Sequence, residues 1–173
     1  MRLDTVDLTL RQIAAAIGTS HRMLVYHFGS KEGLLVEVVR RLEDDQRQRL
    51  KKLLDDDVGN PIERMRQLWQ SLTDPTMWPR ERLFFEVYGQ ALRGRPHTKS
   101  LLTEIVEAWL EPLSKFAEQA GIPENERRLA AQLALAVTRG LLLSLLTTGE
   151  RDDVDKTMAY FLEHFGPFRA SIG

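Results

Sequence analysis

Residues 9–35 read TLRQIAAAIGTSHRMLVYHFGSKEGLL, and this stretch decides the fold. Thr9 followed three residues later by Gln12 is a capping box, in which the threonine hydroxyl accepts a hydrogen bond from the amide of Gln12 and the glutamine side chain reaches back to Thr9. Apolar residues then recur with helical spacing at Leu10, Ile13, Ala14 and Ile17. Gly18 marks the C-terminal end of this short helix.

A second and a third helix follow at once. Ser20 is the N-cap of the second helix, and Leu24 and Phe28 share one of its faces as core residues. Ser30 caps the third helix after a Gly-Ser break. Two short helices joined by a glycine turn describe a helix-turn-helix, although αα-hairpins of this kind also occur in ordinary helical bundles.

The rest of the chain is also helical, because strand-like alternation is scarce and the glycine and proline breakers leave helical segments between them. The third helix ends at the cluster DDDVGNP, residues 55–61, which is the clearest boundary. Beyond it the pattern predicts helices over 61–73, 79–93, 98–120, 124–148 and 152–165. We predict an all-α protein with two domains, a helix-turn-helix domain over residues 1–42 and a larger helical domain over residues 43–173.

The composition is that of a soluble globular protein. Of the 173 residues, 43% are hydrophobic and 28% are charged, which provides enough apolar material for a substantial core. The absence of cysteine excludes disulfides, thiolate zinc sites and cysteine nucleophiles. The N-terminus lacks the apolar run of a signal peptide, and the longest nearly uncharged apolar stretch, which begins at Leu141, is too short to span a membrane. We expect a cytoplasmic protein with no membrane partner.

The charge is distributed unevenly along the chain. The net charge is −1, yet residues 9–36 carry Arg11, Arg22 and Lys31 against Glu32 alone. A small positive surface on a neutral body suits a localised contact with an anion better than non-specific coating of nucleic acid. In a helix-turn-helix the first helix braces the second, whose N-terminal end presents side chains and free amides to the DNA major groove and to phosphate.

The segment LTLRQIAAAIGTSHRMLVYHFGSKEGLL resembles the DNA-binding segment of the tetracycline-repressor (TetR) family of bacterial one-component regulators. The matching positions are Thr9, Ile13, Ala14, Gly18, Leu24, Tyr26, His27, Phe28, Ser30, Lys31, Glu32, Leu34 and Leu35. Beyond this N-terminal segment, the chain is similar only in being an all-helical body of suitable length. The resemblance implies a ligand-responsive transcriptional regulator, commonly a repressor, which binds a palindromic operator in double-stranded DNA as a homodimer and is released by a small molecule.

Carried over to this chain, the resemblance assigns DNA contacts residue by residue. The positions that face base edges are His21, Arg22, Met23 and Val25. Arg22 is the expected guanine reader, because a guanidinium can bond O6 and N7 together, whereas apolar Met23 and Val25 suit thymine methyl groups. The positions expected to hold phosphates are Thr9, Ser20, Tyr26, His27 and Lys31. Arg11 would reach either a base or a phosphate.

Structural roles are the alternatives at several of these positions. Tyr26 and His27 would instead pack against the following helix, and Lys31 and Glu32 would be ordinary surface charges in a first helical turn. His21 and His27 are too far apart along one helix to share a face, which argues against a metal site. We predict neither a metal nor a cofactor.

The resemblance also has one clear departure. In the family a further helix precedes the motif and supplies part of its small core, whereas only eight residues precede Thr9 here. We therefore expect the first helix to be missing or truncated in this chain. This departure favours an alternative function, a helical ligand-binding dimer without DNA-binding activity.

The larger domain, by the same resemblance, binds the ligand and forms the dimer. Aromatic and methionine side chains concentrate in its middle and plausibly line a cavity for an apolar or aromatic effector, although any one of them would also serve as plain core. The predicted ligand-binding residues are Met65, Trp69, Trp78, Phe84, Phe85, Tyr88 and Trp109.

The last two long helices correspond to the pair that forms the four-helix dimer interface in the family. Their apolar residues recur at three- and four-residue steps, a pattern that also fits packing against the protein's own core. The predicted interface residues are Leu129, Leu133, Val137, Gly140, Leu141, Ser144, Met158, Phe161, Leu162 and Phe165. Dimerisation follows from the motif itself, since two copies must sit about 34 Å apart to meet successive major grooves of a palindrome.

No motif in the sequence supports an enzyme, which is the third function class considered. The chain has no phosphate-binding glycine loop, no nucleophile elbow and no HExxH motif, and its carboxylates occur mostly in charged runs. We predict that the protein has no catalytic residues.

Overall fold

The computed structural model describes residues 8–55, 60–95 and 98–164, and within these ranges all regular secondary structure is helical. The helices are α1 (Leu10–Ala16), α2 (His21–Phe28), α3 (Lys31–Asp55), α4 (Pro61–Leu72), α5 (Trp78–Leu92), α6 (Lys99–Gln119), α7 (Glu124–Thr148) and α8 (Arg151–His164). The predicted all-α class is confirmed, and the helix bounds agree with the expected ones to within one or two residues.

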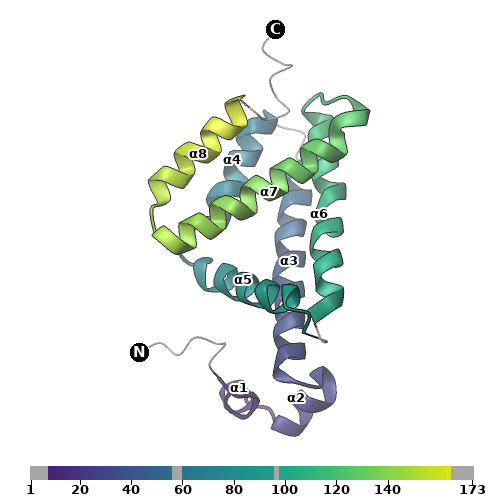
Figure 1. Cartoon of the computed structure of the whole chain (residues 1–173), viewed down its shortest axis with the longest axis vertical. Coiled ribbons are helices and arrows are strands. Elements are labelled where there is room, and N and C mark those ends of the chain that lie inside the picture. Colours follow the sequence, from purple (N-terminus) through teal and green to yellow (C-terminus); the bar gives the residue numbers. More distant parts are fainter. Residues whose placement is uncertain (1–7, 56–59, 96–97, 165–173) are drawn as a thin grey trace.

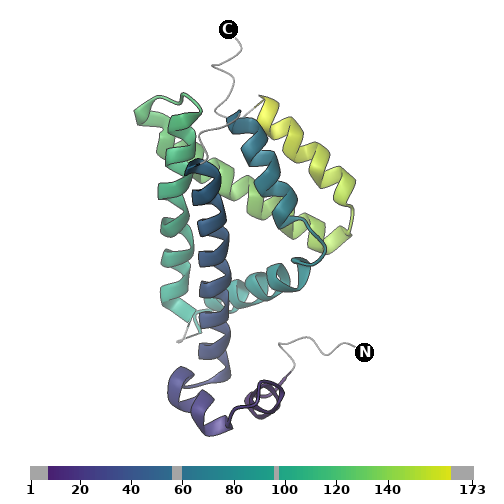
Figure 2. The ribbon, with the colours of Figure 1, turned by 180° about the vertical axis from the view of Figure 1, so that it is seen from behind.

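The helices form an elongated molecule with a small head at one end (Figures 1 and 2). The head consists of α1, α2 and the first turns of α3. Helix α3 then continues into the body, where it lies side by side with α6 in both views. Helix α7 packs against α6 and α8, and α5 contacts α3, α6 and α7. One continuous helix therefore connects the head to the body.

Local capping fixes the two short helices of the head. The capping box predicted at the start of α1 is present, with the Thr9 amide donating to Gln12 Oε1 at 2.8 Å and the Gln12 amide donating to Thr9 Oγ1 at 3.3 Å. At the other end the amide of Thr19 donates to the carbonyl of Ala14 at 2.9 Å, and Gly18 has a φ of 71°. This left-handed glycine closes α1 and turns the chain toward α2.

The corner between α2 and α3 is tight. Ser30 Oγ accepts from the amide of Gly33 at 3.0 Å, which caps the first turn of α3. A Cβ atom on residue 33 would collide with the carbonyl oxygen of Phe28 at the end of α2. Glycine at this position therefore lets the two helices approach closely, and the corner holds the head against the start of α3.

Two apolar clusters hold the body together. The smaller cluster lies next to the head and joins α3, α5 and α6 through Leu35, Val36, Val39, Leu83, Phe84, Val87, Leu101 and Ile105. The larger cluster joins the second half of α3 to α4, α6, α7 and α8. Since packing between α3 and the later helices begins at Leu35, the domain boundary predicted after residue 42 falls inside one continuous, packed helix.

Candidate functional site

Helix α2 presents exposed side chains at the start of the helix. His21, Arg22 and Met23 form its first turn, and all three are exposed. Met23 is 47% exposed and Val25 is 39% exposed. These are the four residues predicted to face base edges, and the structure brings them together on the N-terminal part of one helix. Apolar side chains left accessible beside an arginine suit a mixed polar and apolar contact such as the edges of base pairs.

The residues predicted to hold phosphates flank this group. Thr9 and Ser20 are the exposed N-caps of α1 and α2, where helix ends leave backbone amides directed outward. Tyr26 is 81% exposed, so its ring does not pack in a core, and His27 is exposed beside it. Lys31 is half-buried at the first position of α3.

The support beneath this surface comes from few side chains. Leu24 on α2 is 5% exposed and Ala14 on α1 is 1% exposed, and they are the buried residues of these two helices, which pack against each other. Phe28, predicted as core, is half-buried, and Arg11 lies exposed on α1. The buried residues hold α1 against α2 and leave the polar side chains of α2 outward.

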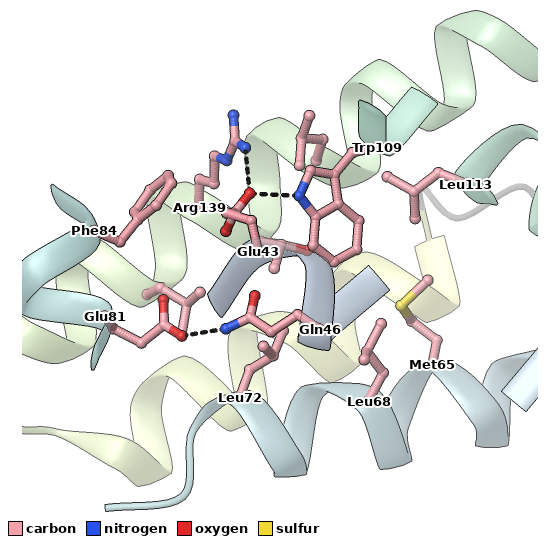
Figure 3. A pocket seen from close by; sticks show the side chains of 13 residues that line it. Glu43, Gln46, Met65, Leu68, Leu72, Glu81, Phe84, Trp109, Leu113 and Arg139 are labelled. Atoms are coloured by element: carbon pink, nitrogen blue, oxygen red, sulfur yellow. Dashed lines mark hydrogen bonds and ion pairs between the residues drawn. The ribbon is translucent and has the colours of Figure 1, made fainter. Parts of the chain in front are cut away.

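A second candidate site is a cavity inside the body, where five helices meet (Figure 3). Its volume is about 40 Å³. The lining side chains come from α3, α4, α5, α6 and α7 and are Glu43, Gln46, Met65, Leu68, Leu72, Glu81, Phe84, Trp109, Leu113, Leu135, Thr138, Arg139 and Leu142. The wall is mostly apolar with a few convergent polar groups, which is the composition of a small-molecule site.

The polar groups of the cavity are linked in two sets. Glu43 Oε2 accepts from Trp109 Nε1 at 2.6 Å and lies 3.5 Å from Arg139 Nη2 (Figure 3). Gln46 Nε2 donates to Glu81 Oε1 at 2.7 Å. Glu43 and Gln46 share one face of α3, so this helix places one member of each set in the cavity wall.

Burial shifts the protonation of both carboxyl groups. Burial raises the pKa of Glu81 to about 7; the hydrogen bond from Gln46 opposes this shift and the charge of Glu43 adds to it. Burial also raises the pKa of Glu43, against the hydrogen bond from Trp109 and the charge of Arg139. The pKa of Arg139 is lowered by burial, with Glu43 acting in the opposite direction.

Three of the predicted ligand-binding residues line this cavity, namely Met65, Phe84 and Trp109. The other four do not belong to its lining and are Trp69, Trp78, Phe85 and Tyr88. The two tryptophans among them make hydrogen bonds to other parts of the chain. Trp69 Nε1 donates to Asp155 at 2.5 Å, and Trp78 Nε1 donates to the carbonyl of Thr73 at 3.1 Å. Tyr88 stacks on the ring of Phe84, one layer behind the cavity wall.

Comparison with known proteins connects this geometry to a family. Residues 6–38, which include both helices of the head, match the family model described as bacterial regulatory proteins, tetR family. The chain is 28% identical over 152 residues to the HTH-type transcriptional regulator BetI of Rhizobium meliloti (strain 1021). The head is therefore similar to bacterial regulatory proteins of the tetR family.

Solved structures of TetR-type regulators share the fold. A TetR transcriptional regulator from Legionella pneumophila superposes with a TM-score of 0.72 at 18% identity, covering 90% of this chain and 87% of that one. A transcriptional regulator from Rhodococcus sp. Rha1 superposes with a TM-score of 0.68 at 19% identity. This match covers 89% of this chain and 84% of that one. The match to BetI covers 88% of this chain and 61% of the relative, so the chain spans less than two thirds of that protein's length.

The residues predicted to form a dimer interface separate into two groups. Leu129, Leu133, Gly140 and Ser144 on α7 are exposed, and Val137 and Leu141 are half-buried. On α8, by contrast, Met158, Phe161 and Leu162 belong to the larger apolar cluster of the protomer and are between 2% and 9% exposed. The assignment of these three residues to an interface does not agree with their burial, because their apolar spacing serves the protomer's own core. Phe165 lies outside the described residues.

The polar residues of the cavity were not among the predicted ligand-binding residues, although the sequence carries a signal for them. Met77, Glu81 and Phe84 recur with a spacing that puts the glutamate on the apolar face of α5. Glu43 and Arg139 interrupt the apolar faces of α3 and α7 in the same way. A charged residue at an apolar position of a helix is therefore the pattern that marks the cavity.

Proposed function

We propose that this regulator represses transcription in the cytoplasm by binding a palindromic DNA operator as a homodimer, and that a small molecule in the inter-helical cavity releases it. The observation that carries the proposal is the path of α3. This helix begins at the corner with α2 and carries Glu43 and Gln46 into the wall of the cavity. A single rigid element thus touches both candidate sites.

The exposed group on α2 supports DNA binding. Arg22 lies exposed in the first turn of α2 beside Met23 and Val25, which leaves its guanidinium accessible for the proposed bidentate contact with guanine. Ser20, Tyr26 and His27 lie exposed around it and are proposed to hold phosphates.

An apolar face of α7 supports dimerisation. Part of this helix is apolar enough in composition to cross a membrane, with a mean hydropathy of 1.8, and only 22% of that part is buried in the protomer. Along this face the exposed residues Leu129, Leu133, Ala136, Gly140, Leu143 and Thr147 recur at alternating steps of four and three residues. This spacing is that of a helix packed along a partner helix. A Cβ atom on Gly140 would meet no atom within 4 Å, which leaves room for a second helix there.

The size of the cavity supports a conformational mechanism. A volume of about 40 Å³ is well below the roughly 300–1,000 Å³ of sites that enclose drug-sized molecules. An effector larger than a few atoms would have to displace the surrounding side chains, including Glu43 and Gln46 on α3. Binding would then favour the arrangement of α3 with more space, and DNA would be released through the effector's differential affinity for that arrangement.

The experiment that tests the proposal is selection of bound duplexes from a random-sequence DNA library, followed by mobility-shift titration. We expect an enriched palindrome whose binding weakens steeply with salt. Arg22→Ala should weaken binding to the enriched duplex by a factor of about 5–150, corresponding to about 1–3 kcal/mol, and should relax preference at one base position. The matched variant Lys31→Ala should weaken binding about equally for all sequences.

Failure to enrich any sequence would contradict the proposal. It would favour the second candidate function, a helical ligand-binding dimer without DNA-binding activity. Equal relaxation of preference by Arg22→Ala and Lys31→Ala would show instead that the assignment of base and phosphate contacts is wrong.

A further inference from the structure

The inter-helical cavity contains a buried carboxylate with no cation paired to it. Glu81 is 4% exposed. Its hydrogen-bond donor is the neutral amide of Gln46, at 2.7 Å. Across the described ranges no lysine, arginine or histidine lies within ion-pair distance of its carboxylate. Burial of a charged carboxylate without an opposite charge is costly, so a cation beside it would be favoured.

The arginine of the cavity is already engaged. Arg139 Nη2 donates to the carbonyl of Ile105 at 2.9 Å and lies 3.5 Å from Glu43. The guanidinium also lies over the ring of Phe84, 5.3 Å from its centroid. The lining of the cavity therefore has two carboxyl groups for the guanidinium of Arg139, whose charge acts on both of them, and an anionic ligand would find no lining cation that is not already engaged. The charge pattern selects for a positively charged ligand.

A second cavity extends the first in an apolar direction. Its volume is about 20 Å³, and Met65, Leu113 and Thr138 line both cavities, so these side chains form the wall between them. Its remaining lining is entirely apolar and consists of Phe116, Ala117, Ala130, Ala134, Met158, Phe161 and Leu162. Met65 is unbranched and adaptable, so the wall can yield to a flexible chain.

Together the two cavities describe a ligand with a cationic head and an apolar tail. We propose that the effector is a primary alkylamine in its protonated form, with the ammonium group donating hydrogen bonds to Glu81 and the alkyl chain passing Met65 into the second cavity. This inference rests on the proposed function only in treating the cavity as the effector site. Binding itself is measured without DNA.

The test is isothermal titration calorimetry of the full chain with n-hexylamine, 1-hexanol and hexanoate, which share one chain length and differ in charge. We expect hexylamine to bind at least about tenfold more tightly than hexanol, and hexanoate not to bind. The Glu81→Gln variant should lose this preference and bind hexylamine and hexanol equally. Glu86→Gln, which removes an exposed carboxylate from the same helix, should behave as the unmodified protein.

Chain length tests the second cavity. The Ala134→Leu variant fills it with a larger side chain, so n-octylamine should lose affinity while n-butylamine keeps its affinity. Thermal unfolding followed by circular dichroism shows that each variant is folded. Equal binding of hexylamine and hexanol by the unmodified protein, or tighter binding of hexanoate, would overturn the inference.

The outcomes separate this inference from the proposed function. Release of DNA by another compound, with no amine bound, would overturn the inference and leave the regulator intact. Binding of amines with the expected preference would support the inference. If the bound amine left the DNA complex unchanged, the proposed release mechanism would be wrong and the inference would still stand.

Discussion

Glu81 shows how a single buried residue makes the stability of the whole protein depend on pH. Its carboxyl group faces Gln46 on α3, with Glu43 and Arg139 as the nearby charged groups. Burial raises its pKa from 4.5 to about 7, because the lost hydration of the ionised form outweighs the hydrogen bond from Gln46 and the charge of Arg139, and the charge of Glu43 adds to the shift. Near neutral pH the group is therefore about half protonated in the folded protein.

The prediction at this scale concerns stability between pH 5 and pH 8. The unfolded chain releases the proton of Glu81 near pH 4.5 and the folded protein near pH 7. The folded state binds more protons in this window, so the free energy of unfolding falls as the pH rises through it, by about 3 kcal/mol at most. The Glu81→Gln variant should lose most of this decrease in the free energy of unfolding. Urea titrations at pH 5 and at pH 8 measure the difference.

The control for this prediction is Glu86→Gln on the same helix, where the carboxylate is exposed. It should show the same pH dependence as the unmodified protein. The raised pKa of Glu43 contributes in the same direction and is retained in both variants. If the free energy of unfolding of Glu81→Gln falls with pH as steeply as that of the unmodified protein, Glu81 does not cause the pH dependence.

At the scale of the element, α3 is the part of the molecule that both candidate sites share. Its first residues are held to α2 by the tight corner at Gly33, and its middle is held to α6 by the ion pair of Arg40 Nε with Glu104 Oε2 at 2.8 Å. Beyond this ion pair, Glu43 and Gln46 reach the cavity. A change of cavity volume is therefore expected to move α3 relative to α6.

A cross-link between α3 and α6 tests this movement. The chain has no cysteine, so Arg40→Cys combined with Glu104→Cys can be bridged at these two positions alone with a bis-maleimide. The bridged protein should bind the selected duplex normally and should no longer be released by an effector found by screening for DNA release. The same double variant without the reagent is the control, and retained release after bridging would exclude α3 as the coupling element.

The helices could be predicted from sequence because their ends are decided locally. The capping box at Thr9, the left-handed turn at Gly18 and the glycine after α7 each act within a few residues. The cavity could not be predicted in the same way. The spacing along the sequence puts both Trp69 and Trp109 on apolar helix faces. Which of the two lines the cavity depends on how α4 and α6 pack against the other helices.

At the scale of the whole molecule, one long apolar face of α7 lies exposed. Leu129 is 65% exposed, Leu133 is 47% exposed and Leu143 is 50% exposed, all on α7. The α8 residues expected beside them are buried within the protomer, so the surface open to a second copy is that of α7. A contiguous apolar surface on one helix is a contact surface by default.

The prediction at this scale is that Leu133→Glu converts the proposed dimer to a monomer. Two glutamates would be brought together at a symmetric interface without a partner charge, which should raise the dimer dissociation constant by about tenfold or more. Sedimentation equilibrium measures this change. Because Leu133 is already partly exposed, the monomer should remain folded.

The matched control is Leu92→Glu, which replaces a leucine that is 65% exposed on another helix, at the end of α5. This variant should sediment as the unmodified protein does. A dimer that persists in Leu133→Glu would place the interface on another surface.

The continuity of α3 also sets a mechanical scale for regulation. Residues 31–43 rise about 18 Å along the axis, so a tilt of about 6° at the cavity displaces the head by about 2 Å. Two heads moving in opposite directions would change their separation by about 4 Å, roughly one base-pair step in the spacing of about 34 Å between successive major grooves. Room for a few extra ligand atoms at one end of this helix would thus be enough to put both recognition helices out of phase with the DNA.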